Sequence, residues 1–347
     1  MTSDVGIKYR FVGDSGLLVS RFAIGGWVVF NNEEEVDRAY EIFVHGYKNG
    51  INFWDTAEAY GAGASERVIG QVLQRGIDNG VWTREDIVIS TKIFEGTQPG
   101  PNNFGWAHLI EGAKASLKRL GVDYVDVIFC HHAETYTPIE EIVRAMNFII
   151  NQGWAFYWGT SNWQEQDILE ACEIADRLGL IRPIVEQPMY NLIERSRVEV
   201  DFQSLYKKYK YGLTTFSPLA FGILTGKYAN GIPEGSRFAD DLYVQIFNII
   251  VGDEKVVIAK VENLRPIAEE LGCSLAQLAL AWVASNDHVS TVILGAKTVA
   301  QLDENLKAFA FVDKLTPELK KRIEEIFPFQ YAAPARSGFF EARGQFL

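Results

Sequence analysis

Short apolar runs alternate with longer amphipathic segments along nearly the whole chain. The runs are rich in β-branched and aromatic residues, which suits parallel strands buried on both faces. Between the runs, apolar residues recur at helical spacing; Leu109, Ala113 and Leu117 share one face of a predicted helix, which Gly121 would end. The predicted strands are Val19–Gly25, Ile51–Asp55, Ile87–Lys92, Val125–His131, Ala155–Thr160, Ile184–Gln187, Leu213–Ser217 and Thr291–Gly295.

Eight strands alternating with helices predict an α/β fold, a closed (β/α)8 TIM barrel. An open doubly wound sheet shares much of this pattern. Such sheets often carry a glycine-rich dinucleotide-binding turn after the first strand, and this chain has none there, which favours the barrel. The predicted helices include Glu33–Asn49, Ser65–Arg75, Ile139–Asn151, Gln166–Leu178 and Val299–Ala308.

Three segments add to this barrel. Turn residues within Tyr9–Gly16 predict a short N-terminal hairpin that plugs one barrel end. The long loop after strand 7, between Leu219 and Lys260, predicts either a lid over the C-terminal face or a surface excursion with a short packed helix. The C-terminal tail, Phe329–Leu347, is too irregular to predict a helix. Because no segment resembles a linker, we expect residues 1–347 to form a single barrel domain.

The charge balance limits the classes of partner. The chain has 33 Lys and Arg against 45 Asp and Glu, a net charge of -12, which disfavours nonspecific binding to nucleic acid or anionic membranes. The cysteines, Cys130, Cys172 and Cys273, share no metal-ligand spacing and indicate a reducing compartment. No segment has the pattern of a secretion signal or a membrane span. We therefore expect a soluble, cytoplasmic protein with no metal site and no direct membrane insertion.

Polar residues stand at or just beyond the ends of three consecutive predicted strands. Asp55 ends the second strand and Tyr60 follows it, while Lys92 and His131 end the next two. A (β/α)8 barrel builds its active site at this end of its strands. Strand alternation favours His131 over its neighbour His132 as the residue that faces inward.

Brought together, these four side chains could protonate a carbonyl oxygen. A phenol has a reference pKa near ~10, but the Lys92 ammonium would lower the pKa of Tyr60, and Asp55 would keep Lys92 charged and oriented. His131 would hydrogen-bond the same substrate oxygen. Since no activated Ser or Cys is evident, a hydride from a bound cofactor would complete a reduction. An ordinary salt-bridged surface cluster is the structural alternative.

Five blocks of sequence together indicate a family. They are Asn52-Phe-Trp-Asp55-Thr-Ala-Glu-Ala-Tyr60-Gly, Ser90-Thr-Lys92, Leu120-Gly-Val-Asp-Tyr-Val-Asp126, Trp158-Gly-Thr-Ser161-Asn162-Trp and Phe216-Ser-Pro-Leu-Ala220. In this order they resemble the aldo-keto reductases, and within them the branch that contains the β subunits of voltage-gated potassium channels. The resemblance covers almost the entire chain. It implies a catalytic tetrad of Asp55, Tyr60, Lys92 and His131, with Tyr60 as proton donor in the NADP-dependent reduction of aldehydes and ketones.

The resemblance also implies NADPH or NADP+ as the cofactor, lying across the barrel mouth. Gly295-Ala-Lys297 precedes a predicted helix N-terminus, which is a natural anion site. The implied contacts are Ser161, Asn162 and Gln187 at the carboxamide, Phe216 and Trp27 at the nicotinamide, Ser217, Leu219, Gly222 and Lys227 along the pyrophosphate, and Gly295, Ala296, Lys297, Gln301, Glu304 and Asn305 at the adenosine and its 2′-phosphate, with Asp55 as a further contact.

This chain departs from the channel-subunit pattern at three positions. Those subunits typically have Asn, Arg and Trp where this chain has His131, Asn162 and Phe216. The resemblance to reductases at the first two positions favours genuine turnover. The alternative is an NADPH-binding, redox-sensing β subunit that docks on a membrane channel. The channel-subunit branch implies a homotetramer, whereas reductases elsewhere in the family are often monomers.

The expected substrate is a small carbonyl compound. Trp27, Tyr60 and His131 are the expected substrate-binding residues. Further aromatic residues, Phe94, Trp163 and Phe339-Phe340, indicate a pocket for an aromatic or medium-length apolar aldehyde.

Overall fold

The computed structural model describes residues 6–27, 30, 32–94, 96–97, 105–133, 136–234, 236–239, 241, 244–245 and 254–329, with only the backbone described at 105, 237 and 254. The expected aromatic pair Phe339-Phe340, all but the first residue of the expected tail and most of residues 240–253 within the expected long loop lie outside these ranges.

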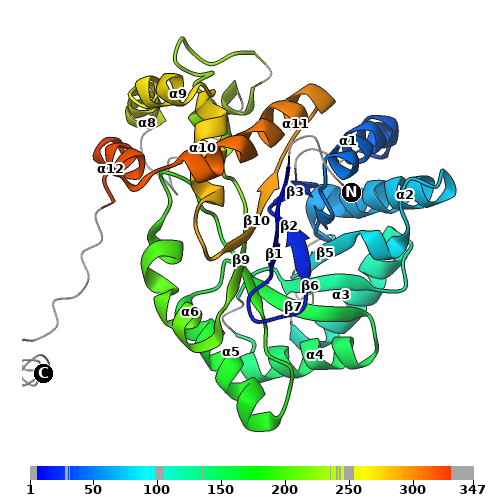
Figure 1. The fold of residues 1–347 in the computed structure, drawn as a ribbon. Coiled ribbons are helices and arrows are strands. Elements are labelled where there is room, and N and C mark those ends of the chain that lie inside the picture. Colours follow the sequence, from blue (N-terminus) through cyan, green and yellow to red (C-terminus); the bar gives the residue numbers. More distant parts are fainter. Residues whose placement is uncertain are drawn as a thin grey trace, which may run out of the picture.

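Eight parallel strands close into a barrel, as the sequence pattern predicts (Figure 1). Each strand pairs with the next along the chain, and the last pairs with the first. The fold is therefore a (β/α)8 TIM barrel. The strands are β3 (Phe22–Gly25), β4 (Phe53–Asp55), β5 (Val88–Ile93), β6 (Val125–Cys130), β7 (Ala155–Ser161), β8 (Val185–Gln187), β9 (Gly212–Thr215) and β10 (Val289–Leu294).

Helices form a ring around the barrel (Figure 1). They are α1 (Val36–Lys48), α2 (Ala64–Asp78), α3 (Gly105–Leu120), α4 (Ile139–Asn151), α5 (Glu165–Leu178), α6 (Gln203–Tyr209), α8 (Glu254–Glu262), α9 (Arg265–Leu271), α10 (Leu275–Ala284), α11 (Val299–Leu306) and α12 (Pro317–Ile326). Among the described residues no single helix is long and apolar enough to cross a membrane. One pair of helical segments, 255–271 and 275–284, reaches that length and apolar composition only when taken together, and the two segments are bent by 84°.

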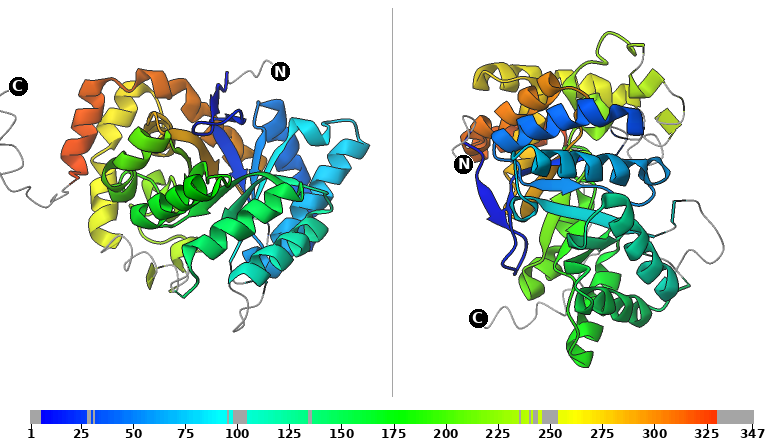
Figure 2. Two further views of the ribbon diagram at one scale, coloured as in Figure 1. Left: turned by 90° about the horizontal axis from the view of Figure 1, so that it is seen from below. Right: turned by 90° about the vertical axis from the view of Figure 1, so that its right-hand side faces the viewer.

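An antiparallel hairpin of β1 (Tyr9–Phe11) and β2 (Leu18–Ser20) covers one end of the barrel (Figure 2). The prediction of one continuous first strand from Val19 to Gly25 was wrong, because the chain bends at Arg21. Before the bend the backbone pairs with β1, whereas the Arg21 carbonyl already accepts from Val292 of β10 at 3.0 Å. Apolar residues continue on both sides of such a change of pairing partner, and only polar Ser20 and Arg21 interrupt the run here.

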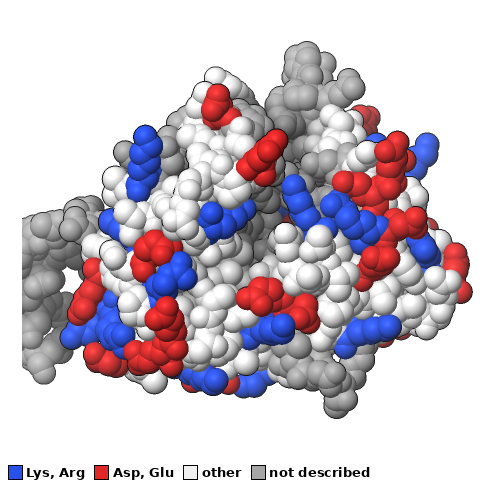
Figure 3. Space-filling model, turned by 90° about the horizontal axis from the view of Figure 1, so that it is seen from above, with Lys and Arg blue, Asp and Glu red and all other residues white. Residues whose placement is uncertain are grey.

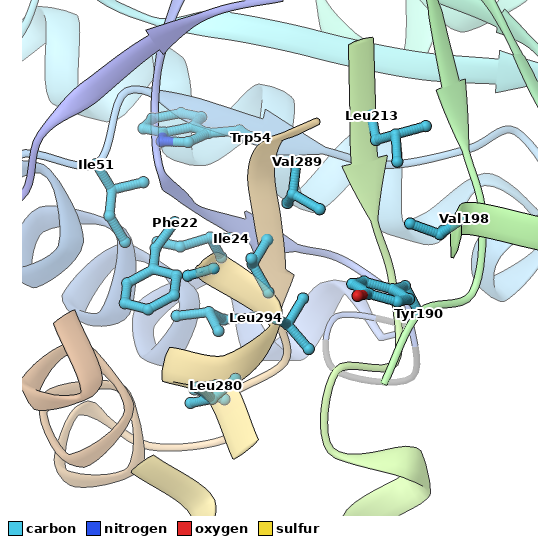
Figure 4. Packing of buried hydrophobic residues seen from close by; sticks show 14 of the residues in the cluster. Phe22, Ile24, Ile51, Trp54, Tyr190, Val198, Leu213, Leu280, Val289 and Leu294 are labelled. Carbon is cyan, nitrogen blue, oxygen red and sulfur yellow. The ribbon is translucent and has the colours of Figure 1, made fainter. Parts of the chain in front are cut away.

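Two apolar layers hold the barrel together. The inner layer fills the barrel with Phe53, Val127, Phe129 and Val185, and the hairpin residue Val12 closes it at the N-terminal ends of the strands. The outer layer joins strands to helices; Figure 4 shows side chains of β3 and β10 close to Leu280 of α10. Since strand residues alternate between these layers, the register of each strand decides which polar residues reach the barrel mouth.

The loop after β9 begins as a packed segment. Residues 220–225 form a 3-10 turn against α8, whose Val257 and Val261 are buried. These described parts fit the predicted surface excursion with a packed helix. The lid interpretation concerns residues that lie largely outside the described ranges.

Candidate active site

The barrel brings Asp55, Tyr60, Lys92 and His131 together at the C-terminal ends of β4, β5 and β6. Asp55 and Lys92 stand two and four residues after Phe53 and Val88, which face the barrel interior, so both also point inward. A turn of left-handed residues at 61–63 follows Tyr60, and its two glycines adopt these angles with little strain.

Lys92 and Asp55 form a buried ion pair. Lys92 Nζ lies 2.6 Å from Asp55 Oδ2 and donates to the Thr56 carbonyl oxygen at 2.8 Å. Asp55 Oδ1 accepts from Ser90 Oγ at 2.7 Å and from Gln187 Nε2 at 3.0 Å. Burial alone would lower the pKa of Lys92, but the charges and hydrogen bonds of Asp55 and Tyr60 outweigh it and raise that pKa. The ammonium is therefore fixed in place and charged.

Tyr60 keeps its proton more firmly than the sequence suggests. Lys92 Nζ lies 4.9 Å from the centre of the Tyr60 ring and lowers the pKa of the phenol, as expected. Burial has the larger effect, with Asp55 adding to it, so the pKa of Tyr60 is raised overall. The expected net lowering was wrong, because the sequence does not reveal how deeply a ring is buried. A protonated phenol at neutral pH is the form that a proton donor requires.

His131 lies beside Tyr60, with ring centres 5.8 Å apart. It follows Phe129, an inner-layer residue, by two positions, and its backbone N–H continues the ladder by donating to the Ile93 carbonyl oxygen at 3.0 Å. The His132 ring stacks on it and also meets Phe94, with ring centres 5.0 Å apart. Burial, Lys92 and His132 hold the pKa of His131 well below its usual value, so the imidazole is neutral.

Hydrogen-bonded side chains extend from the tetrad to the C-terminal ends of β7 and β8. Gln187 bridges Asp55 and Thr214, with its Nε2 3.4 Å from Thr214 Oγ1. Ser161 Oγ donates to the Gln187 carbonyl oxygen at 3.0 Å, and Asn162 follows in the left-handed region at φ 58°. The three residues expected at the carboxamide are thus contiguous, and Gln187 touches the tetrad directly.

Left-handed residues follow β9 in the next part of the mouth. Ser217, Ala220, Phe221 and Gly222 have φ values of 51°, 46°, 58° and 95°. Turns of this kind can gather backbone N–H groups in a concave nest that favours anions. Within this turn the N–H groups of Ala220 and Gly222 donate to the carbonyl oxygens of Ser217 and Leu219, at 3.0 and 2.9 Å. A Cβ atom on Gly222 would lie 3.0 Å from Lys227 Nζ, so this ammonium reaches the turn.

The remaining expected cofactor contacts gather where β10 leads into α11. Lys297 is exposed, and its backbone N–H donates to Gln301 Oε1 at 2.8 Å. Glu304 accepts from Ser274 Oγ at 2.9 Å, and Asn305 is buried. Arg38 Nη1 lies 3.4 Å from the Lys297 carbonyl oxygen and brings a second cation to this corner. Figure 3 shows acidic and basic side chains mixed over one face, with several basic ones bordering a furrow near its centre.

The expected substrate aromatics do not all reach the mouth. Trp27 is 37% exposed and meets Phe221 edge to face, with ring centres 6.1 Å apart. It follows Gly26, where a Cβ atom would overlap the Ser65 hydroxyl. Trp163 was a wrong assignment, because it is fully buried in the outer apolar layer and cannot line an open pocket.

The sequence interpretation missed several supporting residues. Buried Glu58 accepts at Oε1 from the backbone N–H of Phe94 and Gly96, at 2.7 and 2.9 Å, and meets His108 Nε2 at 3.0 Å. It therefore fixes the loop after β5 beside the tetrad. Its position in the sequence, between Asp55 and Tyr60, could have indicated a residue close to the site. The roles of Glu186 and Asn191, discussed below, left no such signal.

The fold and this polar mouth define a class of barrel protein, and comparison with known proteins identifies the family. The model of the Aldo/keto reductase family matches residues 21–327, and the chain belongs to that family. A "Probable voltage-gated potassium channel subunit beta" from Arabidopsis thaliana is 51% identical over 323 residues, 92% of this chain and 96% of the relative. The rice protein of the same name is 50% identical over 323 residues, with the same coverage. A "Putative voltage-gated potassium channel subunit beta" from Schizosaccharomyces pombe is 45% identical over 327 residues, 93% of this chain and 94% of the relative.

Proposed function

We propose that this protein is an NADPH-dependent reductase of aldehydes and ketones. The observation that carries the proposal is the arrangement of a protonated Tyr60 over the buried Lys92–Asp55 ion pair, with a neutral His131 beside it. Membership of the Aldo/keto reductase family supports the same reaction class.

The residues of this chain account for the protonation half of the reaction. A bound NADPH would supply the hydride for the carbonyl carbon. Tyr60 donates its phenolic proton to the carbonyl oxygen, which becomes an alcohol, and the charge of Lys92 stabilises the phenolate that remains until solvent returns the proton. Neutral His131 directs a ring N–H at the same oxygen and orients the substrate.

The mouth fits an extended ligand that carries phosphates. The left-handed turn at 217–222 offers backbone donors with Lys227 beside it, and the start of α11 offers Lys297 and Arg38. Ser161, Asn162 and Gln187 offer amide and hydroxyl groups next to the tetrad. In the proposed complex the first set would hold the pyrophosphate, the second the 2′-phosphate, and the third the carboxamide.

Replacement of Tyr60 by Phe tests the proposed proton donor. We expect NADPH oxidation with 4-nitrobenzaldehyde, followed by absorbance, to fall by roughly 10²- to 10⁴-fold, with NADPH affinity nearly unchanged. Tyr9→Phe is the matched control, because its hydroxyl bonds the Gly50 carbonyl oxygen at 2.8 Å in the hairpin at the other barrel end. Full activity in the Tyr60 variant would rule out this donor.

The relatives' names favour a second candidate, a β subunit of a voltage-gated potassium channel. In this role the chain would bind NADPH and act as a redox sensor. On this reading the chain forms a homotetramer, binds cofactor and turns over little. Affinity capture from membrane extract should then recover a channel protein, and the mass in solution should be about four times that of one chain. Turnover of a carbonyl panel by a monomer that captures no channel would leave only the reductase.

A further inference from the structure

The turn proposed to hold the cofactor pyrophosphate is conformationally strained. Three of its four left-handed residues, Ser217, Ala220 and Phe221, are not glycine. Residues other than glycine keep this conformation only where the surrounding structure imposes the angle. Contacts from outside the turn must therefore hold it in this conformation. One such contact is made to Ser217, the first of its left-handed residues.

Asn191, in the loop after β8, ties that loop to the turn. Its side chain is fully buried, and its Nδ2 donates to the Ser217 carbonyl oxygen at 3.0 Å. The same oxygen accepts from the Ala220 backbone N–H at 3.0 Å, so the amide completes the pair of bonds that fixes the start of the turn.

The other half of the Asn191 amide serves its own loop. Oδ1 accepts from the backbone N–H of Ile193 and of Glu194, both at 2.9 Å. The acceptor therefore shapes the local turn, while the donor of this side chain reaches the segment that follows β9. The two roles belong to different atoms, and an isosteric substitution separates them.

The backbone next to Asn191 reinforces this connection. Tyr190 N donates to the Phe216 carbonyl oxygen at 3.3 Å, and Phe216 N donates to the Pro188 carbonyl oxygen at 3.1 Å. The loop after β8 thus runs alongside the residues after β9 as far as Ser217. Backbone hydrogen bonds join the two segments up to Phe216, and the Asn191 side chain makes the connection at Ser217.

We propose that Asn191 is a positioning residue for the cofactor: its amide donor holds the Ser217 turn in the left-handed form that presents backbone N–H groups to the pyrophosphate. This inference rests on the proposed cofactor binding. Asn191 acts through Ser217, and its loss should weaken cofactor binding more than it slows the saturated enzyme.

The test is Asn191→Asp, which keeps the acceptor and loses the donor. We expect NADPH to bind roughly five- to tenfold more weakly, measured by quenching of tryptophan fluorescence. Affinity for 2′-AMP, which lacks the pyrophosphate, should not change, and KM for NADPH should rise while kcat at saturation stays close to that of the wild type. Asn191→Ala removes the donor without adding charge and should weaken NADPH binding at least as much.

Asn52→Asp is the matched control. Asn52 makes a similar cross-link at the opposite barrel end, where its Oδ1 accepts from Ser20 N at 2.7 Å and its Nδ2 donates to the Leu18 carbonyl oxygen at 3.2 Å. It should leave NADPH affinity unchanged. Wild-type affinity in Asn191→Ala, or an equal loss in Asn52→Asp, would overturn the proposal. Failure of the wild type itself to bind NADPH would overturn the proposed function together with it.

Discussion

Glu186 is a buried acid next to Gln187, on the opposite side of β8. Its Oε1 accepts from the Trp163 backbone N–H at 3.2 Å, and its Oε2 has no hydrogen-bond partner among the described residues. Burial raises the pKa of Glu186 from 4.5 to about 8, although nearby donors oppose the shift. The folded protein therefore prefers the protonated acid at neutral pH.

This preference predicts a dependence of stability on pH. The contribution of Glu186 to the free energy of unfolding is fully present below about pH 4.5 and declines as the pH rises to about 8. The total loss is at most about 5 kcal/mol, and the contribution stays constant above that pH. Glu186→Gln mimics the protonated acid and should lack this decline. Urea unfolding at about pH 5 and about pH 9 measures it, with exposed Glu111→Gln as the control. Parallel curves for wild type and Glu186→Gln would contradict a buried, protonated acid.

At the residue scale the sequence predicts which side chains meet, but not what surrounds them. Asp55, Lys92 and His131 end strands, so period-two alternation and the barrel geometry suffice to bring them together. The sign of the pKa shift at Tyr60 depends on burial, and the partners of Glu186 and Asn191 lie on neighbouring strands or their loops. Such contacts require the folded chain, because no local spacing encodes them.

Helices α2 and α3 approach each other closely at Gly70. A Cβ atom there would overlap the backbone carbonyl oxygen of Leu120, which ends α3 and cannot turn aside. Gly46 in α1 offers a contrast, because a Cβ atom would lie 2.6 Å from Ile24 Cδ1, the tip of a side chain that can rotate.

The two glycines therefore predict different costs for the same substitution. Gly70→Ala should lower the free energy of unfolding by about 1–3 kcal/mol, despite the better helix propensity of Ala. Gly46→Ala should stay within about 1 kcal/mol of the wild type, because that propensity offsets a small repacking. Urea denaturation of both variants measures the difference. Equal effects would mean that α2 and α3 can separate at no cost.

At the element scale, period and length suffice for the eight barrel strands and most of their helices. They fail at Arg21, where one apolar run serves both the hairpin and the barrel. Buried Ser20 and Arg21 occupy that junction: Ser20 Oγ donates to the Phe22 carbonyl oxygen at 2.7 Å, and the guanidinium of Arg21 donates to the Ala284 carbonyl oxygen. Polar residues inside an apolar run were the available sign of a break.

Across the whole molecule, the two ends of the barrel have different roles: the end at the N-termini of the strands, called the lower end here, is closed by packing, and the other end holds the proposed active site. The hairpin closes the lower end, where Arg10 Nη1 donates to the carbonyl oxygens of Asn286, Asp287 and Val289 at 2.8, 3.0 and 2.7 Å. A Cβ atom on Gly13 would lie 2.6 Å from the Ile184 carbonyl oxygen, so the hairpin tip fits closely beneath the start of β8. The polar residues of the proposed active site all lie at the other end.

This division predicts that damage to the lower end lowers stability without affecting binding. Val12 is 1% exposed and belongs to the inner layer, so Val12→Ala should lower the free energy of unfolding by about 2 kcal/mol. NADPH affinity and turnover should stay at wild-type values at a temperature where both proteins are folded, because the hairpin contributes no group to the upper mouth. Val256→Ala, at a valine that is 53% exposed, is the control and should change neither quantity. Weaker NADPH binding by folded Val12→Ala would show that the inner layer transmits packing defects to the mouth, and the barrel would then have to be treated as one coupled unit.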